Sequence, residues 1–341
     1  TLIIESGSDH GVNWTGEVSS RFENRIDFAS VGFLKNLTWE PISNQSTMIG
    51  RYLSLNSVNP IKVKSDPVGR NYLALDSSGN LFAYGQNSYG QLGYHDPENT
   101  YSTYISASTL VATNVKDFDL GSYHSAIISG DNNELLFAGY SNWLQIPGRD
   151  SESTAGGGRY LRAFTSVNIT GIGKIACGGD HTMFVPSSPS LIFNSGEVYT
   201  NGSNRFGELG RQTSTSADGV PRNSFMRFDA TNVAEISAGA NHSAVLRANG
   251  DLYVFGRNFF GELGRGNQVN DDFNLASQEI APFTNVSKVS LGYLHSAYID
   301  ASDKLYTFGY DNYRQLGDST YPVLRTVPTD VFDNIKDVSL G

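Results

Sequence analysis

Residues 252–264 read LYVFGRNFFGELG: an aromatic, apolar run that ends in glycine and continues through an asparagine into a short glycine-containing loop. The same arrangement recurs as LFAYGQNSYGQLG at 81–93, VYTNGSNRFGELG at 198–210 and LYTFGYDNYRQLG at 305–317. A variant copy, LLFAG at 135–139, continues as YSNWLQIPG, and VNWTG at 12–16 is a weaker copy. Because recurrence at a nearly fixed period marks a repeat architecture, the chain consists of copies of one structural unit.

A second element precedes each aromatic run. Histidine follows glycine by three residues and leads into an apolar stretch in GSYHSAII (121–128), GGDHTMFV (178–185), GANHSAVL (239–246) and GYLHSAYI (292–299). GRNYLAL at 69–75 has the same form without the histidine. The structural positions of the repeat are therefore the four histidines, His124, His181, His242 and His295, and the glycines that end the aromatic runs. These glycines lie 53 to 63 residues apart and are Gly85, Gly139, Gly202, Gly256 and Gly309.

Each unit is expected to form a small antiparallel sheet. The apolar runs alternate with polar residues or stay apolar for four to six residues, which favours strands over helices. Turn residues such as Ser78-Gly79-Asn80 and Asn249-Gly250-Asp251 separate the second and third strands of a unit. A fourth strand is expected in SFMRFDA (224–230) and QEIAPF (278–283). Four-stranded sheets repeated around an axis form an all-β propeller, in which each sheet buries its faces against its neighbours.

The ends of the chain are predicted to share one blade. DVSLG at 337–341 matches KVSLG at 288–292, whereas residues 1–16 contain the strands expected to come next in a unit. Pairing between these segments would close the ring. We therefore expect a single domain over residues 1–341 with six to seven blades and an irregular insertion at 17–58.

The combined pattern G-x-x-H-[ST] and L-[YF]-x-[FY]-G-x-N-x-x-G-[QE]-L-G resembles the RCC1 repeat, named for the regulator of chromosome condensation. The resemblance covers residues 59–341 clearly and residues 1–16 weakly. It implies a propeller, usually of seven blades. It also implies a wide choice of roles, among them guanine-nucleotide exchange factors for Ran, substrate-binding parts of ubiquitin ligases, mitochondrial assembly factors and photoreceptors. The photoreceptors use tryptophans in repeated Gly-Trp-Arg-His-Thr motifs, whereas Trp14, Trp39 and Trp143 here lie in other contexts.

Composition narrows the partners. The chain has 24 Lys and Arg against 34 Asp and Glu, a formal net charge of -10, and no basic cluster. Since nucleic-acid binding depends on neutralising phosphates, no nucleic-acid partner is expected. No apolar run is long enough to span a membrane. The single cysteine, Cys177, excludes an internal disulfide. We expect an intracellular protein of the cytoplasm, nucleus or mitochondrion.

No set of residues predicts an enzyme. The four repeated histidines lie one per unit without a close second ligand, so we interpret them as turn-stabilising residues and expect neither a metal nor a cofactor. Glu208 and Glu262 occupy the position that holds Gln91 and Gln315 in other copies, which favours loop capping over acid–base chemistry. We therefore predict no catalytic residues.

The irregular loops are the candidate partner-binding surface, since loops on a rigid scaffold carry binding functions. The loop at 140–160 replaces the repeated glycine turn with Trp143, Leu144 and Ile146 and leads to Arg149. These side chains either form an interaction hot spot or fill the space left by the missing glycine turn. The loop at 94–108 adds three tyrosines, Tyr94, Tyr101 and Tyr104.

The sequence thus favours a non-enzymatic propeller that acts as a scaffold or adaptor for another protein. The first alternative is a guanine-nucleotide exchange factor for a small Ras-like or Ran-like GTPase, which needs a complementary surface rather than a general base. The further alternatives are the substrate-recognition part of a ubiquitin ligase and a mitochondrial assembly factor.

Overall fold

The structure is a computed structural model of the whole chain. It describes residues 60–66, 69–95, 103–141, 143–147, 160–190, 193–210, 226–228, 232–268, 283–312, 315–317 and 324–340. Within these residues the regular secondary structure is entirely β, in nineteen strands. The prediction of an all-β fold is confirmed.

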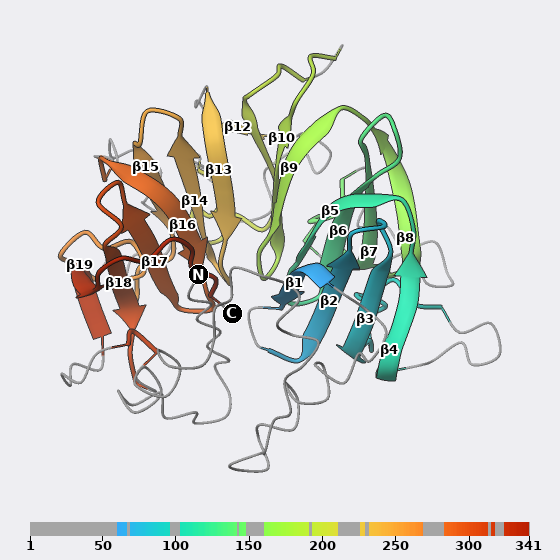
Figure 1. Cartoon of the computed structure of the whole chain (residues 1–341), viewed down its shortest axis with the longest axis horizontal. Helices are drawn as coiled ribbons and strands as arrows, with labels where there is room; N and C mark the ends of the chain where they lie inside the picture. The colour runs from blue at the N-terminus through green and yellow to red at the C-terminus, as the bar shows by residue number, and fades with distance from the viewer. Residues whose placement is uncertain are drawn as a thin grey trace.

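The strands form successive antiparallel sheets that fan around a common axis (Figure 1). Four of the sheets have four described strands and one has three, and sequence neighbours pair throughout. The first sheet contains β1 (Pro60–Ser65), β2 (Asn71–Asp76), β3 (Leu81–Gln86) and β4 (Tyr104–Ala112). The second contains β5 (Val115–Leu120), β6 (His124–Ser129), β7 (Glu134–Tyr140) and β8 (Tyr160–Ile169).

The remaining sheets repeat this order. The third contains β9 (Ile172–Cys177), β10 (His181–Pro186), β11 (Val198–Gly202) and β12 (Met226–Phe228), so the strand expected at 224–230 is present. The fourth contains β13 (Val233–Ala238), β14 (His242–Arg247) and β15 (Leu252–Gly256). Of the strand expected at 278–283, Phe283 forms a bridge with Leu252, and the rest lies outside the described residues. The fifth contains β16 (Val286–Leu291), β17 (His295–Asp300), β18 (Leu305–Tyr310) and β19 (Leu324–Phe332).

Register gives every blade the same two ends. In the second sheet Leu120 pairs with Ser125, His124 with Gly139, and Tyr140 with Tyr160. One end of each blade, which we call the loop end, therefore holds the G-x-x-H turn and the loop after the third strand. The opposite hairpin end holds the turn between the second and third strands. The histidine motif and the glycine loop meet at one face of the ring, although about fifteen residues separate them along the chain.

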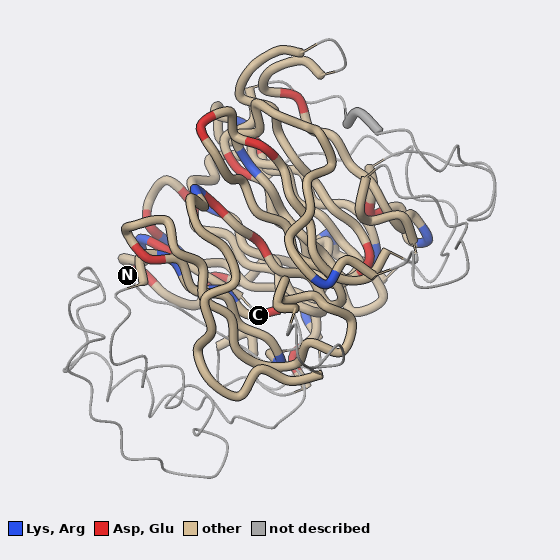
Figure 2. Tube along the Cα trace, turned by 90° about the vertical axis from the view of Figure 1, so that its right-hand side faces the viewer, with Lys and Arg blue, Asp and Glu red and all other residues tan. Residues whose placement is uncertain are grey.

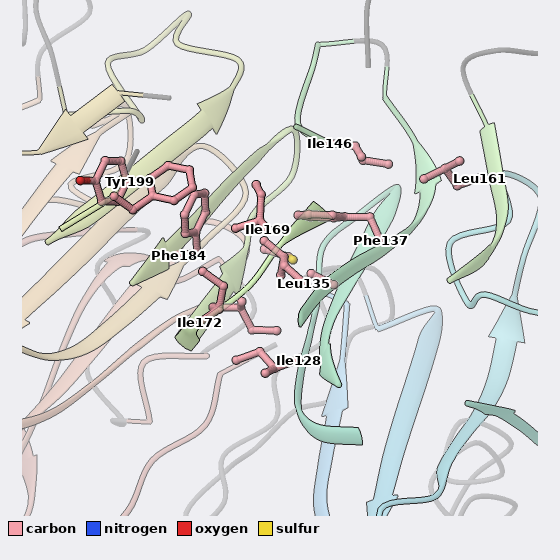
Figure 3. Packing of buried hydrophobic residues seen from close by; sticks show 13 residues of the cluster. Ile128, Leu135, Phe137, Ile146, Leu161, Ile169, Ile172, Phe184 and Tyr199 are labelled. Atoms are coloured by element: carbon pink, nitrogen blue, oxygen red, sulfur yellow. The ribbon is translucent and has the colours of Figure 1, made fainter. Parts of the chain in front are cut away.

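The core lies between the sheets. Phe137, Leu135 and Ile128 of the second sheet meet Ile172 and Phe184 of the third, and all five side chains are buried (Figure 3). Because each sheet is apolar on both faces, it needs a neighbour on either side.

Side chains of the innermost strands, β1, β5, β9, β13 and β16, join consecutive blades near the axis. Asp119 of β5 accepts a hydrogen bond from Lys64 Nζ of β1 at 2.6 Å and another from the Cys177 N–H of β9 at 2.8 Å. The Leu291 N–H donates in the same way to Ser237 Oγ at 3.0 Å. The Asp119 carboxylate thus connects three blades.

Charge alternates from one innermost strand to the next. Three residues before the end of each innermost strand stands a charged residue, in succession Lys62, Asp117, Lys174, Glu235 and Lys288. Asp337 continues the series at the matching position of the C-terminal segment. Lys62 forms an ion pair with Asp117, and Lys288 lies 3.7 Å from Asp337. Opposite charges on adjacent strands favour this order of blades.

The C-terminal segment continues the ring. The Leu340 N–H donates to Ser290 Oγ at 2.9 Å, as Leu291 does to Ser237, so residues 337–340 lie beside β16 as the next innermost segment. Val338 is buried in a cluster with Ala297, Ile299 and Leu305. The residues predicted to complete this blade, 1–16, and the insertion at 17–58 lie outside the described residues. Closure of the ring and a blade number of six to seven remain predictions.

Asp119→Ala is expected to lower the free energy of unfolding by about 2–4 kcal/mol, because it leaves the Cys177 N–H and the Lys64 ammonium without their acceptor. Asp119→Asn keeps an acceptor for the N–H and should lose less. Urea denaturation of both variants measures the difference. Equal stability of Asp119→Ala and the wild-type protein would contradict the inter-blade role of this carboxylate.

Candidate protein-binding face

A buried histidine connects the second, third and fourth sheets each to the next one at the loop end. His124 Nε2 lies 2.8 Å from Thr182 Oγ1, His181 Nε2 lies 2.8 Å from Ser243 Oγ, and His242 Nε2 lies 3.0 Å from Ser296 Oγ. Each hydroxyl follows the histidine of the next blade directly in sequence. The G-x-x-H-[ST] motif therefore supplies one partner to the preceding interface and one to the following interface.

The hydroxyl fixes the state of the imidazole. Thr182 Oγ1 donates to the Gln145 carbonyl at 2.8 Å, Ser243 Oγ to the Glu208 carbonyl at 2.7 Å, and Ser296 Oγ to the Glu262 carbonyl at 2.7 Å. Since a hydroxyl has one proton, its oxygen must accept from the ring, so each Nε2 carries the hydrogen. Burial lowers the pKa of His124 and His295 to about 4 and that of His181 and His242 to about 3. The imidazoles are neutral at physiological pH.

Two glycines show why the motif has its spacing. A Cβ on Gly178 would lie 2.1 Å from His181 Cε1, because the ring folds back over the residue three positions earlier. Gly139 has a φ of +105°, and a Cβ there would lie 2.4 Å from the Tyr123 carbonyl oxygen. Both positions require the absence of a side chain.

The repeated glutamates and glutamines cap the loops. Glu208 accepts from the Phe206 N–H at 2.7 Å, and Glu262 accepts from the Phe260 N–H at 2.7 Å. Gln91 and Gln145 accept from the Tyr89 and Trp143 N–H groups, both at 2.9 Å. Burial raises the pKa of Glu208 and of Glu262. These contacts give the carboxylates a structural role in the loops.

The same loop position carries an aromatic side chain in each of these four blades: Tyr89, Trp143, Phe206 and Phe260. Only the backbone N–H of this residue takes part in the cap. Its side chain is therefore outside the interactions that hold the repeat together, and it is partly or largely exposed.

In the first two blades these loops belong to a tyrosine cluster, which we define as Tyr89, Tyr123, Tyr140 and Tyr160. The Tyr140 and Tyr160 rings are stacked with centroids 4.9 Å apart, and Tyr89 stacks on Tyr140 at 5.4 Å. Tyr123 meets Tyr89 edge-on at 5.3 Å. The outermost member, Tyr160, is 38% exposed. Three separate chain segments thus build one aromatic surface at the loop end.

The segment at 140–160 divides its predicted residues between surface and core. Trp143 is 46% exposed, whereas Ile146 is fully buried against the core shown in Figure 3. Leu144 is half-buried, with a φ of +64°, at the position where Gly90, Gly207 and Gly261 stand in other copies. Ile146 therefore fills the interior, and Trp143 remains a candidate contact. Arg149 lies outside the described residues.

Of the two described tyrosines predicted as partner contacts in the segment at 94–108, one is exposed and the other is half-buried. Tyr94 is half-buried and packs against the core of the first two sheets. Tyr104 is 47% exposed, and its hydroxyl donates to the Tyr84 hydroxyl at 3.1 Å. Tyr101 lies outside the described residues. The sequence analysis did not predict the tyrosine cluster. Its only signal in the sequence is the aromatic residue that lies four positions after the glycine at the end of each aromatic run.

Two features, a metal-binding group and a membrane-spanning helix, are absent from the described residues. No group of three or more His, Cys, Asp or Glu side chains in the described part of the chain is arranged to hold a metal ion. No helix among the same residues is long and apolar enough to cross a membrane.

The fold and the histidine contacts define a β-propeller made from one repeated sheet. Family models of the regulator of chromosome condensation (RCC1) repeat match residues 78–128, 195–246, 249–299 and 233–262. The chain contains RCC1 repeats and is an RCC1-like β-propeller protein.

Curated relatives are similar over most of this chain. The ultraviolet-B receptor UVR8 of Arabidopsis thaliana is 28% identical over 72% of this chain and 52% of its own length. The human E3 ubiquitin-protein ligase HERC2 is 25% identical over 84% of this chain and 6% of its own. The chain thus spans about half or less of these proteins.

Solved structures share the fold. Yeast RCC1 (Prp20), in its complex with Kap60, has a TM-score of 0.60 at 19% identity, covering 83% of this chain and 66% of the other. Human WBSCR16 has a TM-score of 0.61 at 20% identity, covering 82% and 70%. The prediction of an RCC1-like propeller is confirmed.

His181→Gln is expected to make stability less dependent on pH. Below pH 6.5 the unfolded chain binds a proton on His181 that the native protein excludes down to a pKa of about 3. The free energy of unfolding therefore falls with decreasing pH in this window, by up to ~1.4 kcal/mol per unit for this residue. The variant lacks this contribution, so the stability difference between it and the wild-type protein should narrow as the pH decreases.

Urea denaturation at several pH values from 7 to 5 measures this difference, which also cancels the other titrating groups. A gap between wild-type protein and variant that stays constant over this range would show that His181 takes up its proton at the same pH in the native protein as in the unfolded chain, which would contradict the lowered pKa of the buried imidazole.

Proposed function

We propose that the protein is a non-enzymatic scaffold that binds another protein through the loop end of its ring. The observation that carries the proposal is that the loop end presents exposed aromatic side chains, namely Trp143 and, at the edge of the tyrosine cluster, Tyr160. Tyrosine and tryptophan dominate the energetics of protein interfaces, since each buries a large area at a small cost in conformational entropy.

The scaffold beneath this surface supports the proposal. Tyr140 and Tyr160 face each other across paired strands, and Tyr123 belongs to the turn that holds His124. The positions of these rings are therefore set by the sheet and by the inter-blade hydrogen bonds. A preorganised surface loses little entropy when a partner binds.

Exchange activity toward a small GTPase is the alternative with independent support. Yeast Prp20p, which has a TM-score of 0.53 with this chain at 18% identity, was solved in a study of its binding to Gsp1p and histones. An exchange factor acts by binding one state of its GTPase more tightly than another. A broad, rigid surface is sufficient for that purpose.

Substrate recognition for a ubiquitin ligase is an alternative supported by the similarity to HERC2, and mitochondrial assembly is the remaining alternative. Both are forms of protein binding by the same face. They differ from the main proposal in the identity of the partner, which co-purification and mass spectrometry would establish.

Trp143→Ala and Tyr160→Ala are each expected to weaken the affinity for a co-purified partner by about tenfold or more, which corresponds to ~1.4 kcal/mol. Leu110→Ala is the matched control, because Leu110 is also about half exposed but lies on the outer strand β4. Titration calorimetry with the identified partner measures the affinities, and circular dichroism checks the fold.

Two results separate the alternatives. Faster release of labelled nucleotide from a loaded GTPase, at catalytic concentrations of the protein, would favour exchange activity over a scaffold. Unchanged partner affinity in both aromatic variants would refute the loop end as the binding face.

A further inference from the structure

Arginines and lysines occupy different parts of the ring. Among the described side chains, the arginines at the loop end are Arg70, Arg162, Arg205, Arg257, Arg265 and Arg325, and Arg247 lies at the hairpin end. The described lysines lie on the innermost strands or at the hairpin end: Lys62, Lys64, Lys116, Lys174, Lys288, Lys304 and Lys336. Figure 2 marks the basic residues, Lys and Arg together, in blue and the acidic residues in red along the chain.

Exposed acidic residues are sorted in the opposite sense. Those described at the hairpin end are Asp76, Asp131, Glu134, Asp251, Asp300, Asp303, Asp330 and Asp333, all partly or fully exposed. At the loop end the described carboxylates of Asp66, Glu208, Glu262 and Asp311 are buried, and Asp180 is half-buried. Although the chain has a net charge of -10, the described part of its loop end presents mainly arginine.

Two of these arginines converge on phenylalanine rings between the third and fourth blades. The Arg205 guanidinium lies 5.3 Å from the centre of the Phe206 ring, and that of Arg257 lies 5.6 Å from the same ring. Arg257 also lies 5.0 Å from Phe259 and 5.2 Å from Phe260. We call these five residues the arginine–phenylalanine cluster.

The cluster leaves charge available to a ligand. Arg205 is exposed, and the Arg257 side chain is 22% exposed. Arg257 Nε lies 3.7 Å from Glu262 Oε1, so the two form an ion pair without a hydrogen bond at Nε. Aromatic faces hold guanidinium planes by cation–π attraction while the N–H edges remain able to bind carboxylates in pairs.

We infer that the arginine–phenylalanine cluster binds an acidic segment of the partner protein. Its carboxylates would bond the guanidiniums of Arg205 and Arg257, and an apolar side chain of the segment would lie against the phenylalanine rings. The inference rests on the proposed protein-binding function and specifies the chemistry of the partner.

Charge favours an acidic peptide over a nucleic acid. Affinity for a nucleic acid comes largely from lysines and arginines that neutralise several phosphates along its backbone. The cluster offers two arginines over one blade interface, in a strongly acidic protein. A short peptide segment with a few carboxylates can use this site without approaching the acidic hairpin end.

The test measures fluorescence anisotropy of a labelled peptide, DEEFDEEFDE, with the full chain in low salt. Its counterpart, in which Asn and Gln replace Asp and Glu, reports binding without charge. We expect the acidic peptide to bind at least about tenfold more tightly than the counterpart, and Arg205→Glu to remove that preference.

Arg247→Glu is the matched control, because the Arg247 guanidinium also lies over a ring, 5.0 Å from the centre of Tyr253, but at the hairpin end. It should bind the acidic peptide like the wild-type protein. Equal affinity for the two peptides would overturn the inference, as would equal losses in Arg205→Glu and Arg247→Glu. Tighter, Arg205-dependent binding of a single-stranded oligonucleotide would also overturn it, since the site would then serve nucleic acid.

The same variants separate this inference from the proposed function. If Trp143→Ala weakens the co-purified partner and Arg205→Glu does not, the scaffold function holds and the acidic-segment site is refuted. If none of Trp143→Ala, Tyr160→Ala and Arg205→Glu affects the partner, both are refuted. Loss of partner affinity in both variants, together with loss of the peptide preference in Arg205→Glu, supports both.

Discussion

The neutral imidazole buried between neighbouring blades is the interaction on which the ring depends. His124, His181 and His242 each donate from Nε2 to a hydroxyl of the next blade, and that hydroxyl donates in turn to a loop carbonyl of the histidine's own blade. The hydroxyl is thus tied to both the turn and the loop of the preceding blade. Nonpolar packing alone allows sheets to slide or rotate, whereas this two-point contact sets how each blade sits against the next. In the first sheet Asn71 stands at the histidine position, yet Ser125 Oγ still donates to the Gln91 carbonyl at 2.6 Å, so the second half of the arrangement is retained.

The repeat itself could be predicted because its physical requirements are local. A glycine must precede the histidine by three residues where the imidazole folds back over it, and a carboxylate or amide must follow the loop aromatic by two residues to cap its N–H. Such spacings are visible in one sequence. The capping role of Glu208 and Glu262 followed from glutamine at the same position in other copies, and the structure shows the same N–H contact for both residue types.

The surface could not be predicted in the same way. Tyr89, Tyr123 and Tyr160 come from three segments whose approach depends on loop packing between two blades, so no spacing in the sequence relates them. Trp143 and Ile146 lie three residues apart, and both are large and apolar. Only the capped loop decides that one is exposed and the other is buried, because Gln145 holds the Trp143 N–H while Ile146 turns into the core. Ile146 therefore follows the packing interpretation of this segment, whereas an interaction role for the exposed Trp143 stays a proposal.

The division between fixed and free positions also explains where function can vary. Among the described residues, the histidines and hydroxyls that join the blades at the loop end are buried, and substitution there weakens an interface. The loop aromatic contributes only its backbone N–H to the cap, so the cap does not depend on the identity of its side chain. Tyrosine, tryptophan and phenylalanine therefore all occur at this position without loss of the repeat. Leu144 extends this tolerance, since a residue with a φ of +64° occupies a glycine position while the cap beside it is kept. A fold that holds its geometry through buried histidines can change its surface one loop at a time, and the tyrosine cluster and the arginine–phenylalanine cluster are the two surfaces for which we propose a binding role.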